Sequence, residues 1–234
     1  MNPIIEINHL SFRYPDGKQA LDDIHMCVLP GEKISLIGAN GAGKSTLLHH
    51  LNGILTGNGG IRIDGMEMKK QNLGRIRALV GLVFQNPDDQ LFSPTVFEDV
   101  AFGPIYQGFD RKVISRKVEA ALEAVNMGEY AGRNPYHLSS GEKKRIAIAT
   151  VLAMQPKILV FDEPSSGLDP RARREFIELL QKMPQTQVIA THDLNLAQQL
   201  TSRTILLYQG KIVADGSSLE ILEDHQLLFN FGLY

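Results

Sequence analysis

Short apolar segments bounded by turn residues recur along the chain and predict β-strands. Two of them, residues 4–10 and 20–29, flank the turn YPDG at positions 14–17, which predicts an N-terminal antiparallel β portion. Further strands are predicted for the segments KISLIG (33–38), IRIDG (61–65), LVGLVFQ (79–85), KILVFDEP (157–164), TQVIATHD (186–193), RTILLYQG (203–210) and KIVADG (211–216). Several are continuous apolar runs, which are typical of strands buried on both faces.

Between residues 87 and 155 a helical period replaces these short runs. In the segment SRKVEAALEAV, one helical face collects Val118, Ala121, Leu122 and Val125. Strands alternating with helices elsewhere predict an α/β fold with a mostly parallel sheet. We therefore expect one domain over residues 1–234, in which a helical subdomain at 87–155 is inserted into a core formed by 1–86 and 156–234.

Composition and charge are those of an ordinary globular protein. The chain has 234 residues, 43% of them apolar and 21% charged, and its net charge of −2 offers no basic surface to nucleic acid. No stretch approaches the roughly 20 apolar residues that span a bilayer, and the N-terminal segment lacks the features of a signal peptide. The single cysteine, Cys27, is expected to be a small buried apolar residue in a reducing compartment. These features predict a cytosolic protein, or one held at a membrane by its partners.

The segment GANGAGKST (38–46) matches the phosphate-binding pattern G-x-x-x-x-G-K-[ST] and lies between a predicted strand and a predicted helix. Glycines let consecutive backbone N–H groups turn toward a phosphate chain, the lysine neutralises its oxygens, and the hydroxyl ligates Mg²⁺. The candidate phosphate-binding residues are Gly38, Asn40, Gly41, Ala42, Gly43, Lys44, Ser45 and Thr46, of which Ser45 is also a metal ligand. An ordinary glycine-rich turn is the alternative.

Two acidic residues follow another buried strand, in the segment ILVFDEP. Asp162 would lie beside the Mg²⁺ at the carboxyl end of its strand, and Glu163 would act as general base on a water molecule aligned with the γ-phosphate. Gln85, after GLVF, would reach the metal and the same water, and His192, after VIAT, would hydrogen-bond the γ-phosphate. The alternatives are a solvated turn for the acidic pair and a structural role for His192.

A second helix start is predicted in HLSSGEKKRIAIA (137–149), where unpaired N–H groups and the helix dipole suit an anion. In this order and at this spacing, the motifs resemble the ATP-binding cassette family over essentially the whole chain. The resemblance identifies Walker A (38–46), the Q-loop (Gln85), the signature (138–142), Walker B (158–162), the D-loop SGLD (166–169) and the switch His192. It implies the P-loop fold of these ATPases and hydrolysis of ATP with Mg²⁺. It also assigns adenine stacking to Tyr14, the alternative being a turn tyrosine with no ligand.

The resemblance further implies a head-to-tail pair of cassettes, either a homodimer or a heterodimer with a second ATPase. Ser139 and Gly141 of one signature, with Asp169 at the same seam, would then complete the ATP site of the partner, and hydrolysis would let the two cassettes part. The signature departs from L-S-G-G-Q at Ser140 and Glu142. We expect function to survive because the backbone N–H donor at position 140 is kept, whereas an inward-pointing Glu142 would repel phosphate.

Residues 84–104 and 138–170 resemble the ATPases of energy-coupling-factor importers, most closely the branch that imports cobalt or nickel ions, and the short chain favours the same branch. The resemblance implies a peripheral location at the cytoplasmic face of the membrane and docking near the Q-loop on a membrane scaffold protein. It also implies a small substrate-binding membrane protein and no direct contact with the transported ion. The acidic residues there, Asp88, Asp89, Glu98 and Asp99, either pair with basic groups of the scaffold or form a solvated loop face.

Other functions and other roles stay open at this point. Vitamin uptake and a soluble iron–sulfur assembly cassette are alternatives to metal-ion import, while a DNA-maintenance ATPase is disfavoured because no long coiled coil or basic surface separates the motifs. His49 and His50 are expected to be structural, since adjacent helical residues do not face the same way. The apolar tail at 227–234 is expected to pack on the core, a contact with a partner being the alternative.

Overall fold

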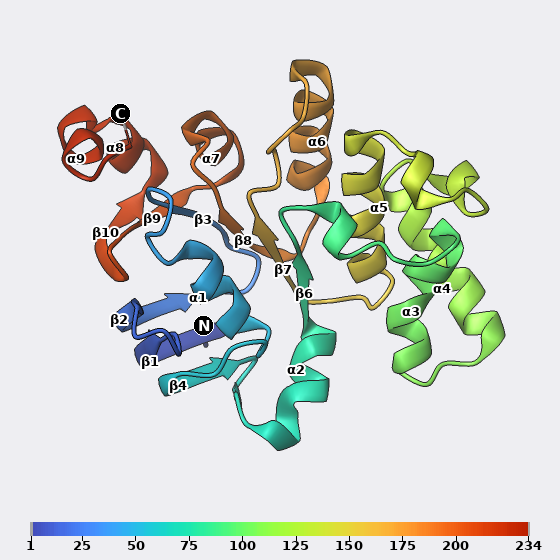
Figure 1. Ribbon diagram of the computed structural model, residues 1–234, viewed down its shortest axis with the longest axis horizontal. Helices are drawn as coiled ribbons and strands as arrows, with labels where there is room; N and C mark the ends of the chain where they lie inside the picture. Colours follow the sequence, from blue (N-terminus) through green and yellow to red (C-terminus); the bar gives the residue numbers. More distant parts are fainter. Residues whose placement is uncertain (1, 234) are drawn as a thin grey trace.

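A six-stranded sheet forms the centre of the computed structural model, which describes residues 2–233 (Figure 1). In spatial order its strands are β10 (Lys211–Ser217), β9 (Arg203–Tyr208), β3 (Lys33–Ile37), β8 (Thr186–Ala190), β7 (Ile158–Asp162) and β6 (Val80–Val83). All neighbours pair in parallel except β10, which is antiparallel to β9. Along β7, Val160 faces one apolar core while Leu159 and Phe161 face the other. Because both faces are covered, these strands are continuous apolar runs in the sequence.

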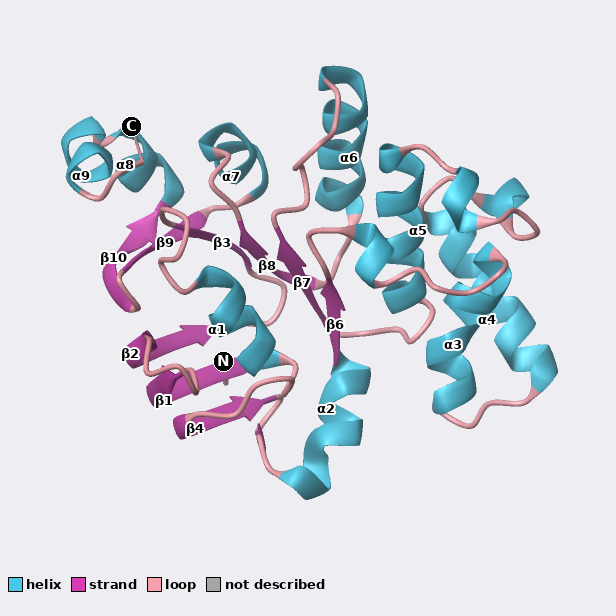
Figure 2. Ribbon diagram, in the orientation of Figure 1, coloured by secondary structure: helices cyan, strands magenta, loops and turns pink. Residues whose placement is uncertain are grey.

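A smaller antiparallel sheet lies beside the first, at the lower left of Figure 2. In spatial order it holds β2 (Gln19–Val28), β1 (Ile5–Arg13), β4 (Asn58–Ile63) and β5 (Met66–Glu67). Its buried side chains, Ile7 and Leu10 among them, share one core with Leu47 and Leu48 of α1 (Lys44–Leu51) and with one face of the large sheet. The first core thus attaches the N-terminal strands to the parallel sheet.

Helices cover the other face and the β6 edge of the large sheet (Figure 2). They are α3 (Val96–Tyr106), α4 (Arg111–Ala124), α5 (Ser140–Leu152), α6 (Pro170–Lys182), α7 (Leu194–Leu200), α8 (Ser218–Glu223) and α9 (His225–Asn230). The helix α2 (Leu73–Leu79) instead contributes Ile76 to the first core. The group α3, α4 and α5 occupies the segment for which helices were predicted, and the predicted face of α4 is buried. The predicted α/β fold class is confirmed. Within residues 2–233, no helix is both long and apolar enough to cross a lipid bilayer.

Two smaller predictions have different outcomes. Cys27 is exposed, so the prediction that it is buried was wrong: β2 alternates, and its neighbours Met26 and Val28 take the buried positions. The C-terminal tail packs on the core as predicted, because Leu228 of α9 is fully buried among side chains of the large sheet, α7 and α8. Tyr234 of that segment lies outside the described residues.

Lys144 of α5 ties the helical region to the carboxyl edge of the sheet. Its side chain is buried, and its Nζ donates hydrogen bonds to the backbone oxygens of Pro164 (2.9 Å) and Gln85 (3.3 Å), which follow β7 and β6. Burial lowers the pKa of Lys144 to about 8, while the nearby charge of Glu163 opposes this shift. The side-chain amine of Lys144 therefore links α5 to the segments after β6 and β7, and its charged form loses hydration free energy on burial.

We expect the stability difference between wild type and Lys144→Met to depend on pH. The pKa of Lys144 is about 8 in the folded protein and 10.5 for a free lysine, so the folded state loses its proton first. Wild type should therefore gain stability relative to Lys144→Met as the pH rises through this window, by on the order of 3 kcal/mol for the full shift. Urea unfolding of both proteins at a series of pH values measures the difference.

The matched control is Lys143→Met, on the same turn of α5, whose amine contacts Asp88 instead. A difference between wild type and Lys144→Met that stays constant from pH 8 to pH 10.5 would contradict the expected desolvation of Lys144.

Candidate nucleotide-binding site

The loop between β3 and α1 folds closely against the first β-hairpin. Gly43 caps α1 at φ 110°, and a Cβ at this position would lie 2.6 Å from the Ala20 carbonyl oxygen, so a side chain does not fit. Gly41 is also left-handed, at φ 82°. Among the described residues no side chain caps the start of α1, and the loop residues line a cleft, which suits the first N–H groups of the helix to bind phosphate.

A cleft of about 370 Å³ lies over this loop and collects side chains from distant parts of the chain. It is lined by Tyr14, Lys18, Ala20, Asn40, Gly41, Gly43, Lys44, Ser45, Thr46, Gln85, Glu163 and His192. Most of these residues were predicted from the motifs. Two other predicted residues lie behind the lining: Ala42 is buried, and the Gly38 carbonyl accepts a hydrogen bond from Lys44 Nζ at 2.7 Å.

Asp162, at the end of β7, is buried beside Ser45. Ser45 hydrogen-bonds the Asp162 carboxylate, whose Oδ1 has no hydrogen-bond partner within residues 2–233. Burial raises the pKa of Asp162, and the hydrogen bond from Ser45 opposes this shift. A divalent cation between these two side chains would give the unpaired oxygen a partner, and carboxylate and hydroxyl oxygens are ligands that Mg²⁺ accepts. The residues present therefore fit a magnesium ion.

Glu163, the next residue, has a different set of partners. Its Oε2 lies 2.9 Å from Nδ1 of His192 and accepts hydrogen bonds from the His192 N–H and the Thr191 hydroxyl. Its Oε1 lies 3.7 Å from Nζ of Lys44. Glu163 adopts φ 45°, which is uncommon for a residue with a side chain and turns it away from the path of β7. A buried carboxylate beside the cleft is thus held in place, with the exposed ring of His192 next to it.

Tyr14 and Lys18 extend the cleft along the first hairpin. The Tyr14 hydroxyl hydrogen-bonds Thr46 Oγ1 at 3.0 Å, so the ring stands over the start of α1. Lys18 was not predicted, although its Nζ lies only 4.0 Å from the position of a Cβ built on Gly41. Its signal was weak: a lysine directly after the turn that carries Tyr14. It adds a positive charge above the phosphate-binding loop.

The signature and D-loop residues do not line this cleft. Ser139 caps α5, and both its hydroxyl and its N–H donate to Glu142 Oε2 at 2.8 Å in a capping box. Asp169 caps α6, and a Cβ built on Gly141 would lie 3.5 Å from Cβ of Ala172, near the start of α6. Ser139 and Asp169 are exposed. The two helix starts therefore form a second, separate group.

Glu142 is turned back on its own helix. Besides the contacts with Ser139, its Oε1 accepts a hydrogen bond from the Tyr130 hydroxyl at 2.7 Å. The hydrogen bonds from Ser139 and Tyr130 lower the pKa of Glu142. The Glu142 carboxylate is thereby held at the N-cap of α5, next to Ser139.

The two histidines of α1 stay apart from the phosphate-binding surface. His50 is fully buried and its Nδ1 donates to the Thr46 carbonyl oxygen at 2.7 Å, while burial lowers its pKa. His50 is structural, as predicted. His49 is half-buried and neither residue lines the cleft.

Comparison with known proteins identifies the family. The family model described as ABC transporter matches residues 21–166, more than half of the chain. An energy-coupling factor transporter ATP-binding protein, EcfA, from Methanothermobacter thermautotrophicus is 48% identical over 231 residues, which cover 96% of this chain and 74% of the relative.

Solved structures agree with this assignment. The structure of cbiO1 from Clostridium perfringens, part of the ABC transporter complex cbiONQ, has a TM-score of 0.87 at 34% identity and covers 100% of this chain and 96% of its own. The ATP-binding cassette MJ0796, a dimer in a post-hydrolysis state bound to ADP and Pi, has a TM-score of 0.82 at 26% identity and covers 92% and 98%. The chain belongs to the ABC transporter family and is one of its ATP-hydrolysing cassettes.

Proposed function

We propose that this chain is the ATPase of an energy-coupling-factor importer, peripheral to the cytoplasmic face of the membrane, and that the cleft over the β3–α1 loop is its ATP site. The observation that carries the ATP site is the meeting of a phosphate-binding loop, Glu163 and His192 in one cleft, with Asp162 buried beside Ser45. The EcfA relative supports the importer class.

In the proposed site, Lys44 exchanges partners when ATP binds. Its Nζ now contacts the carbonyl oxygens of Gly38 and Ala39, and phosphate oxygens would replace them. Ser45 and Asp162, with Gln85 from the end of β6, would hold Mg²⁺. When bound, Mg²⁺ neutralises charge on the β- and γ-phosphate oxygens. Tyr14 would stack on the adenine.

Glu163 would take the proton from the attacking water. A general base must be fixed within hydrogen-bond reach of that proton, and Glu163 is fixed by the N–H of His192 and the hydroxyl of Thr191. The His192 ring, whose side chain is 62% exposed, would contact the γ-phosphate from the same side. Asp162 and Glu163 thus divide metal binding and proton transfer between them.

A pair of cassettes, identical or different, would complete each site. Ser139, Gly141 and Asp169 lie on a group of helix starts outside the cleft, and the similarity to a dimeric cassette supports a head-to-tail pair. Each chain would offer this group to the ATP held by the other.

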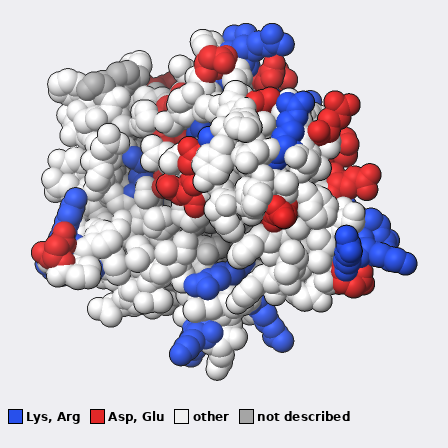
Figure 3. Space-filling view, turned by 45° about the vertical axis from the view of Figure 1, so that its right-hand side comes forward, with Lys and Arg blue, Asp and Glu red and all other residues white. Residues whose placement is uncertain are grey.

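An apolar groove near the Q-loop is the proposed contact with the membrane scaffold. The groove, of about 500 Å³, runs between α2, the segment after β6, and α3. Phe92, Phe102 and Tyr106 line it and are 60%, 56% and 81% exposed, and the first two rings pack edge to face at 5.3 Å. Exposed apolar clusters of this kind mark interaction sites. On the face shown in Figure 3, acidic and basic side chains are both present and much of the surface between them carries neither.

The acidic residues near the groove differ in how free they are to contact a membrane scaffold protein. Asp99 is buried, and its Oδ1 accepts the N–H groups of Phe92 and Ser93, so it shapes the loop rather than reaching a partner. Glu98 belongs to the capping box of α3 with Thr95, and Asp88 pairs with Lys143. Asp89 lines the groove.

We further propose that the cargo is a cobalt or nickel ion, carried through a small substrate-binding membrane protein and not through this chain. The resemblance of residues 84–104 and 138–170 to the metal-ion branch supports this. Uptake of labelled Co²⁺, Ni²⁺ and vitamins by cells that express the complete transporter tests it. Vitamin uptake, or recovery of the ATPase with no membrane partner, would favour the alternatives.

Glu163→Gln should keep ATP binding and lower turnover by roughly two to four orders of magnitude, the usual contribution of a positioned base. The amide keeps the shape of the side chain but cannot accept the proton. Phosphate release measures turnover, nucleotide titration measures binding, and size-exclusion chromatography with ATP should show the closed pair accumulating. Glu175→Gln, on the exposed surface of α6, is the control. Near-normal turnover in Glu163→Gln would remove Glu163 from this role.

Phe102→Glu should abolish co-purification with membrane partners, because it places a charge in the groove, while MgATP hydrolysis by the isolated protein stays near wild type. Leu219→Glu is the matched control, since Leu219 is similarly exposed (57% against 56%) but lies on α8. Pull-down from detergent-solubilised membranes compares them. Equal recovery of partners with both variants would place the contact elsewhere.

A further inference from the structure

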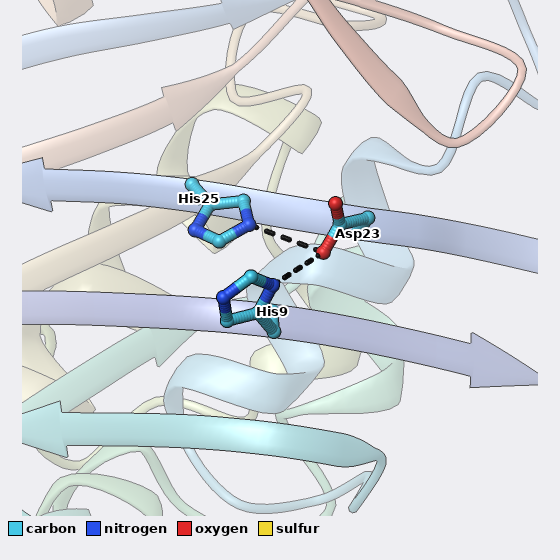
Figure 4. Close-up of side chains that lie close together, drawn as sticks. All are labelled: His9, Asp23 and His25. Atoms are coloured by element: carbon cyan, nitrogen blue, oxygen red, sulfur yellow. Dashed lines mark hydrogen bonds and ion pairs between the residues drawn. The ribbon is translucent and has the colours of Figure 1, made fainter.

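Two histidines and an aspartate lie close together on the antiparallel sheet (Figure 4); all three are exposed, and none of them lines the nucleotide cleft. His9 comes from β1, and Asp23 and His25 come from β2. One ligand atom from each lies within 4.8 Å of the other two. We propose that these side chains bind a divalent transition-metal ion of the zinc, cobalt, nickel and copper class.

Two bulges in the β1–β2 pairing bring the ligands together. Between the pairs Ile7–Met26 and Leu10–Ile24, two residues of β1 oppose one of β2, and His9 lies in this bulge at φ 54°. Between the pairs Leu10–Ile24 and Phe12–Leu21, two residues of β2 oppose one of β1. Asp23 lies in this second bulge and adopts φ 53°. Bulges redirect side chains relative to a regular ladder. Both side chains are thereby turned toward His25.

Two of the three distances between ligand atoms match those of a coordination shell, and the third, between the two histidines, is within 4.8 Å. Nδ1 of His9 and Nε2 of His25 lie 2.8 Å and 3.1 Å from the same oxygen, Oδ1 of Asp23. Metal bonds of about 2.0–2.2 Å place neighbouring ligand atoms roughly 3 Å apart. The side chains therefore need only small movements to admit an ion. Their exposed fractions, 75% for His9, 63% for Asp23 and 45% for His25, leave the other coordination positions open to water.

The donor set decides which ions fit. Imidazole nitrogen with one carboxylate favours zinc, copper and nickel, whereas Mg²⁺ prefers oxygen ligands throughout. The site is thus chemically distinct from the oxygen-lined magnesium site at Asp162, and it rests on none of the functional proposals above.

An ion here would join two strands of the hairpin that carries Tyr14. Because Tyr14 and Ala20 both belong to this hairpin and line the nucleotide cleft, the ion would stiffen one wall of that cleft. Binding to the folded state alone also raises the temperature of unfolding. Metal binding can therefore be measured in two ways: by the heat released or absorbed on titration, and by the rise in the unfolding temperature.

The test uses the full-length chain, freed of any affinity tag and of nucleotide, in buffer with excess Mg²⁺ to occupy oxygen-lined sites. Calorimetric titration with Zn²⁺ or Ni²⁺ should show one ion per chain. His9→Gln and His25→Gln should each weaken binding at least about tenfold, as expected for loss of a residue that holds the metal. The same ions should raise the unfolding temperature of wild type and not that of the variants.

His137→Gln is the matched control, because it removes an exposed histidine outside the cluster and should leave the affinity unchanged. Asp23→Asn offers a second variant that keeps the side-chain size, and circular dichroism with MgATP titration checks that all variants fold. Absence of binding by wild type, or equal affinity in wild type and both histidine variants, would overturn the proposal.

Discussion

The site depends on two adjacent carboxylates that are buried at the end of one strand but face different partners. A buried carboxylate is costly unless it is paired. Glu163 meets this requirement through His192, Thr191 and the ammonium of Lys44. Asp162, beside Ser45, keeps one oxygen for which the described part of the chain supplies no partner. The chain itself therefore supplies the hydrogen-bond and charge partners of Glu163, the residue proposed as base. A bound cation would supply the partner that Asp162, the residue proposed as metal ligand, lacks in the described structure. This asymmetry explains how neighbouring residues of the same chemical type can take different roles.

The surroundings keep that edge of the sheet both rigid and open. Lys144 holds the backbone after β6 and after β7 from one side, so the segments that carry Gln85 and the acidic pair cannot separate without breaking its hydrogen bonds. From the other side, Gly43 lets the loop approach Ala20 more closely than any side chain allows. Rigid strand ends and an uncovered loop are what precise placement of a phosphate chain and a water molecule requires.

Sequence patterns predicted the strands, the helical region and most of the cleft, because each depends on local order: apolar runs, helical period and motif spacing. The features that sequence patterns did not predict depend on the register and bulges of paired strands and on tertiary packing. Cys27 is exposed because buried and exposed positions alternate along β2 and Cys27 occupies an exposed one. Lys18 lines the cleft because the β1–β2 hairpin folds over the loop that contains Gly41. The meeting of His9 with Asp23 and His25 requires two bulges of opposite strands, which a single sequence does not specify. Lys144 likewise finds its acceptors through tertiary packing of α5.

The two departures from the family signature, Ser140 and Glu142, are explained by their positions in the first turn of α5. Ser140 lies in the first turn of α5, a right-handed position where a Cβ causes no strain, so glycine is not required there. Glu142 stands three residues after the N-cap, where a capping box accepts glutamate as well as glutamine. Its carboxylate accepts hydrogen bonds from the Tyr130 hydroxyl and from Ser139, which hold it at the N-cap of α5. The capping box takes up the N–H groups of Ser139 and Glu142, so an anion at this helix start would meet the N–H groups of Ser140 and Gly141, which lie between them.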